Sequence, residues 1–352
     1  MCISPLKGFQ IGWNPSGKPQ YKICSYDTDH VEYRKHGWYA SNLSVPNSPK
    51  FVREFVEIPC GHCRECRLKY SREWADRLLL ESLEHEHTWF ITLTYSDANL
   101  PLNFDSDGVL VNGGVPHPTL VKKHVQDFLK RLRRWLEYNG YNDKIRYYCA
   151  GEYGDHTHRP HYHMVLFGMD IPDLVPYKIT KLGFQLYNSN ILNKIWSHGY
   201  VVIGQFTWET GAYVARYTMK KVNGLSKEDY INAGIQPEFA IMSRKPGIAR
   251  NWFDANKGRF LEEAYVQIGD RQIRPNRYYL RLLEDICPEW YEDRKVTNRI
   301  LGESRAFKKD KDFKKLIDSD MKLPLKKIRI ARIEYEKTVA ESNKKGFFRP
   351  EF

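Results

Sequence analysis

Hydrophobic residues recur along this chain with two periods, one typical of helices and one typical of strands. Residues 67–86 repeat Leu and Trp at helical spacing among charged residues, which predicts a helix. Residues 88–95 are aromatic and β-branched and predict a buried strand. A loop with Gly and Pro follows at 96–117. Residues 118–138 then predict a second helix, with one apolar face and one basic face.

The pattern continues into a second group of strands and helices. Residues 145–152 and 161–167 predict two strands, and the short turn between them predicts a hairpin. A short helix at 188–197, a strand at 200–206 and a helix at 208–222 follow. The order strand–helix–strand–strand–helix–strand–helix is typical of the ferredoxin-like split βαβ arrangement, in which helices back an antiparallel sheet. We therefore predict an α+β fold.

The segments on either side of this pattern have a different character. Residues 1–58 are rich in Gly, Pro, Tyr and Asn without a sustained period, so we expect an irregular segment with short strands at best. Residues 225–298 are mixed, and 303–345 are highly charged and predicted to be helical or partly disordered. The predicted division is an N-terminal segment at 1–87 with a helix and a cysteine cluster, an α+β domain at 88–224, and a basic, partly helical C-terminal region at 225–352.

The charge balance favours an anionic partner. The chain carries 55 Lys and Arg against 43 Asp and Glu, a net charge of +12. About half of this surplus lies in residues 303–352, which hold 15 basic and 9 acidic residues. Such a surplus suits nucleic acid, although a well-solvated protein of another kind can also be basic.

Membrane insertion and export are not expected. The sequence has no run of about 18 apolar residues, so no membrane span is predicted. The first residues lack the apolar stretch of a secretion signal, and the expected location is a cytoplasm. The seven cysteines are an odd number, which argues against a disulfide framework in such a compartment.

Three of these cysteines recur at every third position: Cys60, Cys63 and Cys66. Three thiolates need a fourth ligand to enclose a tetrahedral zinc ion. Cys2 or Cys24 could supply it, and His62 is a weaker choice. A structural zinc would tie the N-terminal segment to the helix at 67–86. An iron–sulfur cluster, or thiols without a metal at the start of a helix, are the alternatives.

Two histidines share one face of the strand predicted at 161–167. Side chains alternate along a strand, so His161 and His163 point the same way and Tyr162 points to the opposite face. Such a pair often binds nothing, but here the other arm of the hairpin ends in Glu152. Its carboxylate would complete a His-His-Glu site for Mg²⁺ or Mn²⁺ with open positions for water and phosphate. Rival third ligands on the turn are His156 and His158.

Two tyrosines share one face of the helix predicted at 208–222. Tyr213 and Tyr217 are four residues apart, and Lys221 extends the same stripe by one turn. An aromatic stripe of this kind can simply pack on a sheet, but Arg216 and Lys220 make the segment too basic for full burial. A tyrosine hydroxyl beside a bound metal can attack a phosphodiester, leaving a DNA 5′-end on the tyrosine and a free 3′-hydroxyl. The hypothesis is a tyrosine-dependent endonuclease.

Four segments carry a resemblance to the HUH endonucleases, and in particular to the replication initiators of microviruses of the gokushovirus type. They are Phe-Ile-Thr-Leu-Thr-Tyr at 90–95, Arg-Pro-His-Tyr-His at 159–163, Tyr-Val-Ala-Arg-Tyr-Thr-Met-Lys-Lys at 213–221, and Pro-Cys-Gly-His-Cys-Arg-Glu-Cys at 59–66. The resemblance covers about 59–260 and makes 88–224 the nuclease domain.

The resemblance implies a function and a set of roles. His161 and His163 would bind the divalent ion, Tyr213 and Tyr217 would be alternating nucleophiles, and Lys221 would assist them. The family's third ligand varies in position, so Glu152 is the less supported member. The implied process is rolling-circle replication: single-stranded origin DNA of the phage is nicked and rejoined, with a host helicase, polymerase and single-strand-binding protein as partners in the host cytoplasm.

Two other functions fit some of the same residues. A relaxase or transposase would use the same chemistry on other DNA. A zinc-stabilised nucleic-acid-binding module without chemistry would use the tyrosines only to stack on bases.

Overall fold

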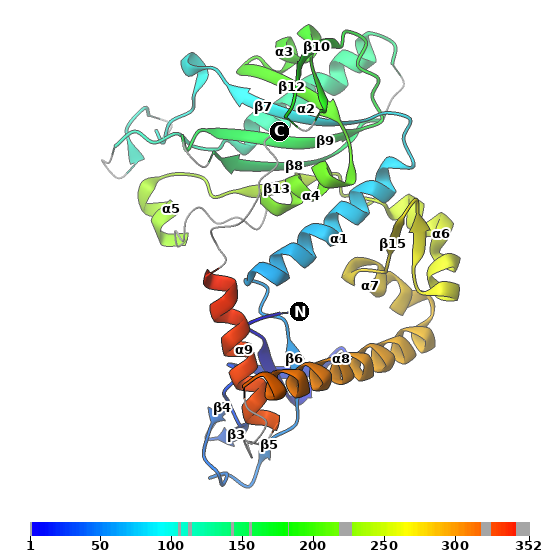
Figure 1. Cartoon of the computed structure of the whole chain (residues 1–352). Helices are drawn as coiled ribbons and strands as arrows, with labels where there is room; N and C mark the ends of the chain where they lie inside the picture. Colours follow the sequence, from blue (N-terminus) through cyan, green and yellow to red (C-terminus); the bar gives the residue numbers. More distant parts are fainter. Residues whose placement is uncertain are drawn as a thin grey trace. The chain divides into compact units, whose positions relative to one another are not determined.

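The computed structural model describes residues 2–104, 107–111, 115–141, 144–154, 157–181, 183–217, 227–317 and 325–342 (Figure 1). Contacts divide the chain into two compact units. The described residues of 70–283 form what we call the sheet unit, and those of 1–69 and 284–348 form the terminal unit. Among the helices of these ranges, none combines the length and apolar character needed to cross a bilayer.

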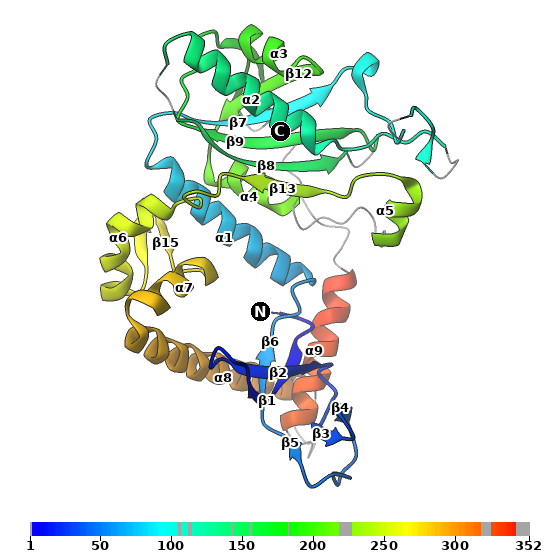
Figure 2. The ribbon, with the colours of Figure 1, turned by 180° about the vertical axis from the view of Figure 1, so that it is seen from behind.

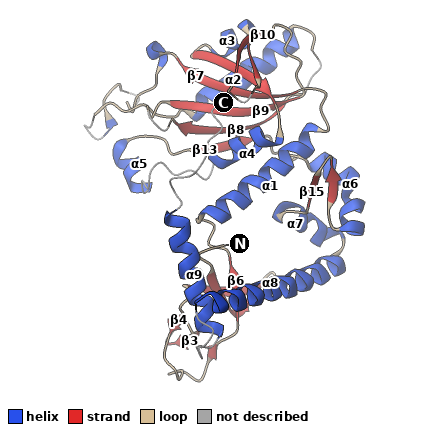
Figure 3. Cartoon of the chain, viewed as in Figure 1, coloured by secondary structure: helices blue, strands red, loops and turns tan. Residues whose placement is uncertain are grey.

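A seven-stranded antiparallel sheet is the centre of the sheet unit, with strand order β10-β11-β12-β7-β9-β8-β13 (Figure 3). Its strands are β7 (Thr88–Tyr95), β8 (Arg146–Tyr153), β9 (Pro160–Phe167), β10 (Val175–Ile179), β11 (Gln185–Asn188), β12 (Gly199–Gln205) and β13 (Phe239–Met242). The helices that flank it in sequence are α1 (Arg64–Ser82), α2 (Lys122–Tyr138), α3 (Asn190–Trp196), α4 (Trp208–Tyr217) and α5 (Lys227–Ala233).

The four central strands contain two interleaved strand–helix–strand units. β7 and β8 are joined through α2 and run in the same direction, with antiparallel β9 between them. β9 and β12 are joined through α3 and likewise have β7 between them. This is the strand order that a split βαβ arrangement requires. The α+β class with an antiparallel sheet is confirmed.

The hydrophobic core lies between the sheet and helices α2 and α3. Alternate residues of the central strands, such as Leu93 and Met164, point to this face and pack against Phe128 and Leu132 of α2. Trp196 of α3 is fully buried there, and its indole Nε1 donates to the carbonyl oxygen of Thr94 at 2.8 Å. Seen from behind, α2 crosses this face of the sheet (Figure 2), whereas α4 packs over β8 and β9 on the other.

Helix α2 begins four residues later than predicted. Tyrosine hydroxyls hold the preceding segment in an extended conformation: Leu120 N–H donates to Tyr153 Oη at 3.0 Å, and Val121 N–H donates to Tyr162 Oη at 2.8 Å. These bonds satisfy backbone donors that a helix would otherwise use. Three strands of the sheet were not predicted, namely β10, β11 and β13, since all are short and every residue of β10 is exposed.

The rest of the sheet unit is a small helical region with one short hairpin. It consists of α6 (Arg250–Glu263), β14 (Val266–Ile268), β15 (Arg271–Ile273) and the first part of α7 (Arg277–Ile286).

The terminal unit is more regular than predicted. Its N-terminal part forms two three-stranded sheets, with orders β2-β1-β6 and β4-β3-β5. The strands are β1 (Leu6–Trp13), β2 (Pro19–Cys24), β3 (His30–Arg34), β4 (Gly37–Ser41), β5 (Phe51–Val52) and β6 (Phe55–Ile58).

Helices from the far end of the chain complete this unit: α8 (Pro288–Ile317) and α9 (Leu325–Ser342). The helical prediction for 303–345 is confirmed over its described residues. Arg329 of α9 contacts both Asp310 of α8, at 2.7 Å, and Glu57 of β6, at 3.4 Å. The compact units therefore differ from the three consecutive segments expected from sequence, because pairing between the two ends of a chain leaves no local pattern.

Candidate metal centre and active site

The β8–β9 hairpin brings three predicted metal ligands to one face of the sheet. Glu152 lies directly opposite His161 in the strand register, and His163 lies opposite Ala150. Directly opposed residues share a face, as do residues two apart on one strand. Tyr162, between the histidines, is fully buried in the core on the other face, which confirms the predicted alternation.

The two imidazoles converge on one carboxylate oxygen. Glu152 Oε1 lies 2.6 Å from His161 Nε2 and 2.9 Å from His163 Nε2. On the far side of each ring, His161 Nδ1 donates to the carbonyl oxygen of Arg159 at 3.1 Å, and His163 Nδ1 lies 3.0 Å from Thr92 Oγ1. Because a carbonyl only accepts, His161 carries its proton on Nδ1 and leaves the Nε2 lone pair toward Glu152. Metal-bound histidines are oriented in this way in proteins.

The electrostatics of this cluster fit a divalent cation. The ligand atoms of Glu152, His161 and His163 all lie within 4.8 Å of one another. Glu152 is 3% exposed, and its second oxygen, Oε2, has no hydrogen-bond partner among the described residues. Burial raises the pKa of Glu152, but the hydrogen bonds to His161 and His163 outweigh it and hold the pKa below its usual value. A buried, ionised oxygen without a partner is costly unless a cation binds it.

The rival ligands on the turn do not join this cluster. His158 is exposed in the left-handed region, with φ 51°, and it is absent from the described groups that could hold a metal. His156 lies outside the described residues. Glu152 is thus the third ligand that the geometry supports.

Helix α4 places Tyr213 beside the cluster. The Tyr213 ring centroid lies 5.1 Å from that of His163, with the rings at 75°. Phe90 completes the group, since its ring stacks on His163 at 5.5 Å and meets Tyr213 at 6.1 Å. The tyrosine proposed from sequence and the proposed metal ligands therefore lie on the same face of the sheet.

The start of α4 is fixed by reciprocal hydrogen bonds. Thr207 N–H donates to Thr210 Oγ1 at 2.9 Å, and Thr210 N–H donates to Thr207 Oγ1 at 3.2 Å, as in a capping box. Ser71 of α1 donates to the carbonyl oxygen of Ala212 at 2.6 Å. Tyr217 is the last residue of α4. Its side chain and the whole of Lys221 lie outside the described residues, so their roles stay predictions.

Two residues of this region escaped the sequence reasoning. Thr92 orients His163, and Arg159 anchors the turn by donating to the carbonyl oxygen of Tyr95 at 3.1 Å and to Asp97 at 2.7 Å. The signal for Thr92 was present, because alternation along 88–95 puts Phe90, Thr92 and Thr94 on one face.

The cysteine cluster lies in the terminal unit. The thiols of Cys2, Cys60, Cys63 and Cys66 come within 4.8 Å of one another and none forms a disulfide. Cys24 and His62 do not belong to this group.

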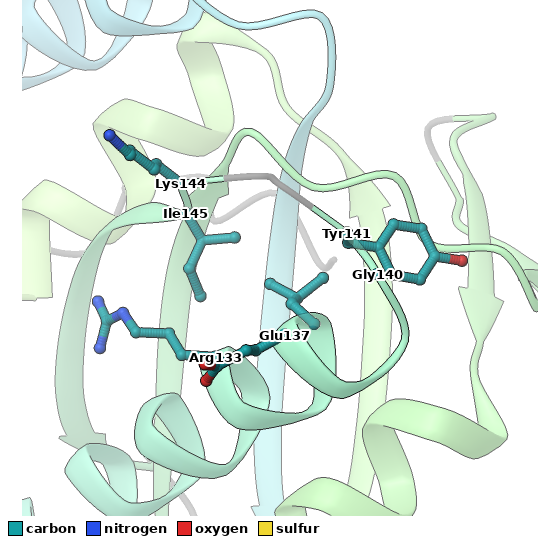
Figure 4. A pocket seen from close by; sticks show the side chains of 7 residues that line it. Arg133, Glu137, Gly140, Tyr141, Lys144 and Ile145 are labelled. Atoms are coloured by element: carbon teal, nitrogen blue, oxygen red, sulfur yellow. The ribbon is translucent and has the colours of Figure 1, made fainter.

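A separate pocket of about 350 Å³ lies at the end of α2 and the start of β8 (Figure 4). Arg133, Glu137 and Lys144 line it together with apolar residues. Glu152 is six residues further along β8 than Arg146, which corresponds to about 20 Å. The pocket is therefore not part of the candidate site.

Comparisons with known proteins are consistent with one another. A family described as replication-associated protein ORF2 matches residues 88–222. The chain is 34% identical over 241 residues to the replication-associated protein ORF2 of Spiroplasma virus 4, covering 67% of this chain and 69% of the relative. It is 30% identical over 276 residues to the replication-associated protein VP4 of Bdellovibrio phage phiMH2K, covering 74% and 80%. It is also 30% identical over 263 residues to the replication-associated protein ORF4 of Chlamydia phage 1, covering 74% and 61%. No solved structure matches significantly.

Proposed function

The chain belongs to the family of microvirus replication-associated proteins, and on that basis we propose that it initiates rolling-circle replication as a metal-dependent endonuclease of the HUH type. Its substrate in this proposal is single-stranded phage DNA at a replication origin. The observation that carries the proposal is the packing of Tyr213 against His163, with His161 and Glu152 on the same face.

In this proposal Glu152, His161 and His163 hold Mg²⁺ or Mn²⁺. The bound ion supplies Lewis-acid polarisation of the scissile phosphate and stabilises charge on its oxygens. Three protein ligands leave open positions, as a catalytic site requires. Thr92 and the Arg159 carbonyl keep both imidazoles turned toward the ion.

The chemical step is an in-line exchange at phosphorus. The Tyr213 or Tyr217 hydroxyl gives up its proton and its oxygen attacks the phosphorus. A phosphorus–O(Tyr) bond forms, the bond from phosphorus to the 3′-oxygen breaks, and that oxygen takes up a proton. A phenol with an ordinary pKa of about 10 attacks poorly unless its ionised form is favoured, a role proposed for the ion and Lys221.

The reaction conserves the energy of the phosphodiester. The DNA 5′-end stays on the tyrosine, and the free 3′-hydroxyl primes synthesis by a host polymerase. Reversal of the same step joins ends without ATP, and a second tyrosine allows a new cleavage while the first is occupied. Strand separation and protection would come from a host helicase and single-strand-binding protein.

A cleavage assay tests the proposal. Single-stranded oligonucleotides that tile the phage genome, labelled at the 3′-end, are incubated with the full chain and Mn²⁺ and run on a denaturing gel. The proposal predicts a labelled protein–DNA adduct for at least one tile, and none for the Tyr213→Phe, Tyr217→Phe double variant. Binding of every tile without an adduct would instead indicate a nucleic-acid-binding module without chemistry.

A further inference from the structure

The terminal unit contains a second group of metal-binding side chains: Cys2, Cys60, Cys63 and Cys66. Cys60 follows β6, Cys63 directly precedes α1, and Cys66 lies in the first turn of α1. Pairing of Leu6 in β1 with Ile58 in β6 brings Cys2 to the same turn. The strand register thus selects Cys2 as the fourth thiol, although Cys24 is also close to β1.

The distances between the sulfurs fit one ion. Cys2 Sγ lies 3.5 Å from Cys60 Sγ and 3.7 Å from Cys63 Sγ. A disulfide needs about 2.05 Å. Sulfurs bound about 2.3 Å from one tetrahedral zinc ion lie about 3.8 Å apart. An iron–sulfur cluster separates its cysteines further, because they bind different iron atoms.

Backbone amides add to the suitability of these thiols as ligands. Cys60 N–H points at Cys2 Sγ at 3.4 Å, and Cys63 N–H points at Cys60 Sγ at 3.3 Å. Burial raises the pKa of Cys60, but backbone donors from Cys63 and His62 outweigh it and lower the pKa to about 7. A thiolate is the form that binds metal, and its binding releases the thiol proton.

We propose that Cys2, Cys60, Cys63 and Cys66 bind one structural zinc ion, independent of the proposed nuclease metal. Four protein ligands close the coordination sphere, so no position is left for water or substrate. The ion cross-links the start of β1 to the turn between β6 and α1. It fixes the N-terminal sheet to the first turn of the helix.

Metal analysis of the full chain tests this proposal. Purified under reducing conditions, the wild-type chain should carry one zinc per molecule, and Cys63→Ser should lose it. Cys24→Ser is the matched control, since it removes a thiol near β1 outside the cluster, and it should keep the zinc. Absence of zinc from the wild type, or equal loss in both variants, would overturn the proposal.

Cobalt substitution provides a readout that needs no variant. Co²⁺ in place of zinc in the wild-type chain should give the intense visible absorption of a tetrahedral site and thiolate-to-cobalt charge-transfer bands. A weak, octahedral-type spectrum would contradict four thiolate ligands even if Cys63→Ser fails to fold.

A different observation concerns Tyr200 of β12. Tyr200 pairs with Thr94, and Thr94 pairs with His161, so all three lie in one row on the face of the metal ligands. Two strand spacings put Tyr200 about 10 Å from His161. Helix α4 covers β8 and β9 on this face, and the Tyr200 ring on the β12 side is 64% exposed.

We infer that Tyr200 stacks on a base of the single-stranded DNA next to the cleaved phosphate. This inference rests on the proposed function. Stacking on an exposed aromatic ring is sequence-tolerant, because every base has a π-face. The row from Tyr200 to His161 would then lead the strand from the uncovered part of the sheet to the ion.

Binding without cleavage tests this role. By fluorescence anisotropy in EDTA, Tyr200→Ala should bind single-stranded DNA about tenfold more weakly, whereas Tyr200→Phe and Tyr200→Trp should bind like the wild type. Tyr138→Ala is the control, since Tyr138 is 74% exposed on α2, across the sheet. Unchanged binding by Tyr200→Ala, in a chain whose wild type forms the adduct, would overturn the stacking role alone. A missing wild-type adduct would refute the proposed function and this inference with it.

Discussion

Glu152 and His161 face each other across the β8–β9 hairpin, with the carboxylate Oε1 2.6 Å from the imidazole Nε2. The register of the hairpin fixes this contact, and the same oxygen lies 2.9 Å from His163. The second carboxylate oxygen is buried without a partner among the described residues. One carboxylate therefore holds both imidazoles in place and keeps an oxygen ready for a cation.

Replacing Glu152 by Gln should remove the charge while preserving the volume. We expect cleavage at saturating DNA to fall roughly 100-fold, because the ion loses its only anionic ligand from the chain. Single-turnover rates with Mn²⁺ and direct Mn²⁺ titration measure this. Glu137→Gln, at the exposed end of α2, is the control and should cleave normally. Normal cleavage by Glu152→Gln would show that another group is the third ligand.

Thr92→Val should weaken metal binding without touching a ligand. The change is close to isosteric and deletes the hydroxyl that contacts His163 Nδ1. Loss of such an orienting group lowers metal affinity by about 10- to 100-fold. Thr94→Val is the matched control on the same face, since the Thr94 hydroxyl bonds to the Tyr200 carbonyl and not to an imidazole. Equal Mn²⁺ affinity in the two variants would exclude an orienting role for Thr92.

Tyr162→Phe should separate stability from chemistry. The Tyr162 hydroxyl bonds to Tyr95 Oη at 2.8 Å and accepts from Val121 N–H at 2.8 Å, on the face opposite the metal ligands. Its loss should lower the free energy of unfolding by about 1–3 kcal/mol, since buried partners are left unsatisfied. Urea unfolding measures the loss, and the cleavage rate of the folded variant should stay within a few-fold. A loss of cleavage without a loss of stability would contradict the assignment of faces.

His124 should make the fold sensitive to mild acid. Burial and then the stacked ring of His198, 4.2 Å away, lower the pKa of His124 to about 4, with Asp127 opposing the shift and Arg131 and Lys123 adding to it. The ordinary pKa is about 6.5, so below that pH the unfolded chain takes up a proton that the folded chain does not. The stabilising contribution is complete above pH 6.5 and is lost as the pH falls toward 4. Urea unfolding across this window should show a shallower decline for His124→Asn, and an unchanged slope would refute the assignment.

The sequence reasoning succeeded where local pattern decides the structure. Alternation along 161–163 predicted which face each side chain takes, and the spacing of Tyr213 predicted its helix. It missed β1, because that strand buries Lys7 and includes two glycines. The ammonium of Lys7 is satisfied by the Thr28 carbonyl at 2.6 Å and lies over the rings of Tyr26 and Phe55. No hydrophobic period announces a buried lysine.

The choice of ligand partners was beyond the sequence for a related reason. Cys2 and Cys24 were equal candidates for the fourth thiol, and the pairing of β1 with β6 decides between them. Glu152 could be named only because it lies in the same hairpin as the histidines, where turn length limits the register. Contacts between distant segments have no comparable local signal.

Identification of the residue joined to DNA tests the central claim most directly. The wild-type chain is incubated with single-stranded origin DNA and Mn²⁺, digested with nuclease and protease, and analysed by tandem mass spectrometry. The account predicts a 5′-phosphonucleotide on the oxygen of Tyr213 or Tyr217. An adduct on any other residue, or cleavage that leaves no adduct at all, would contradict it.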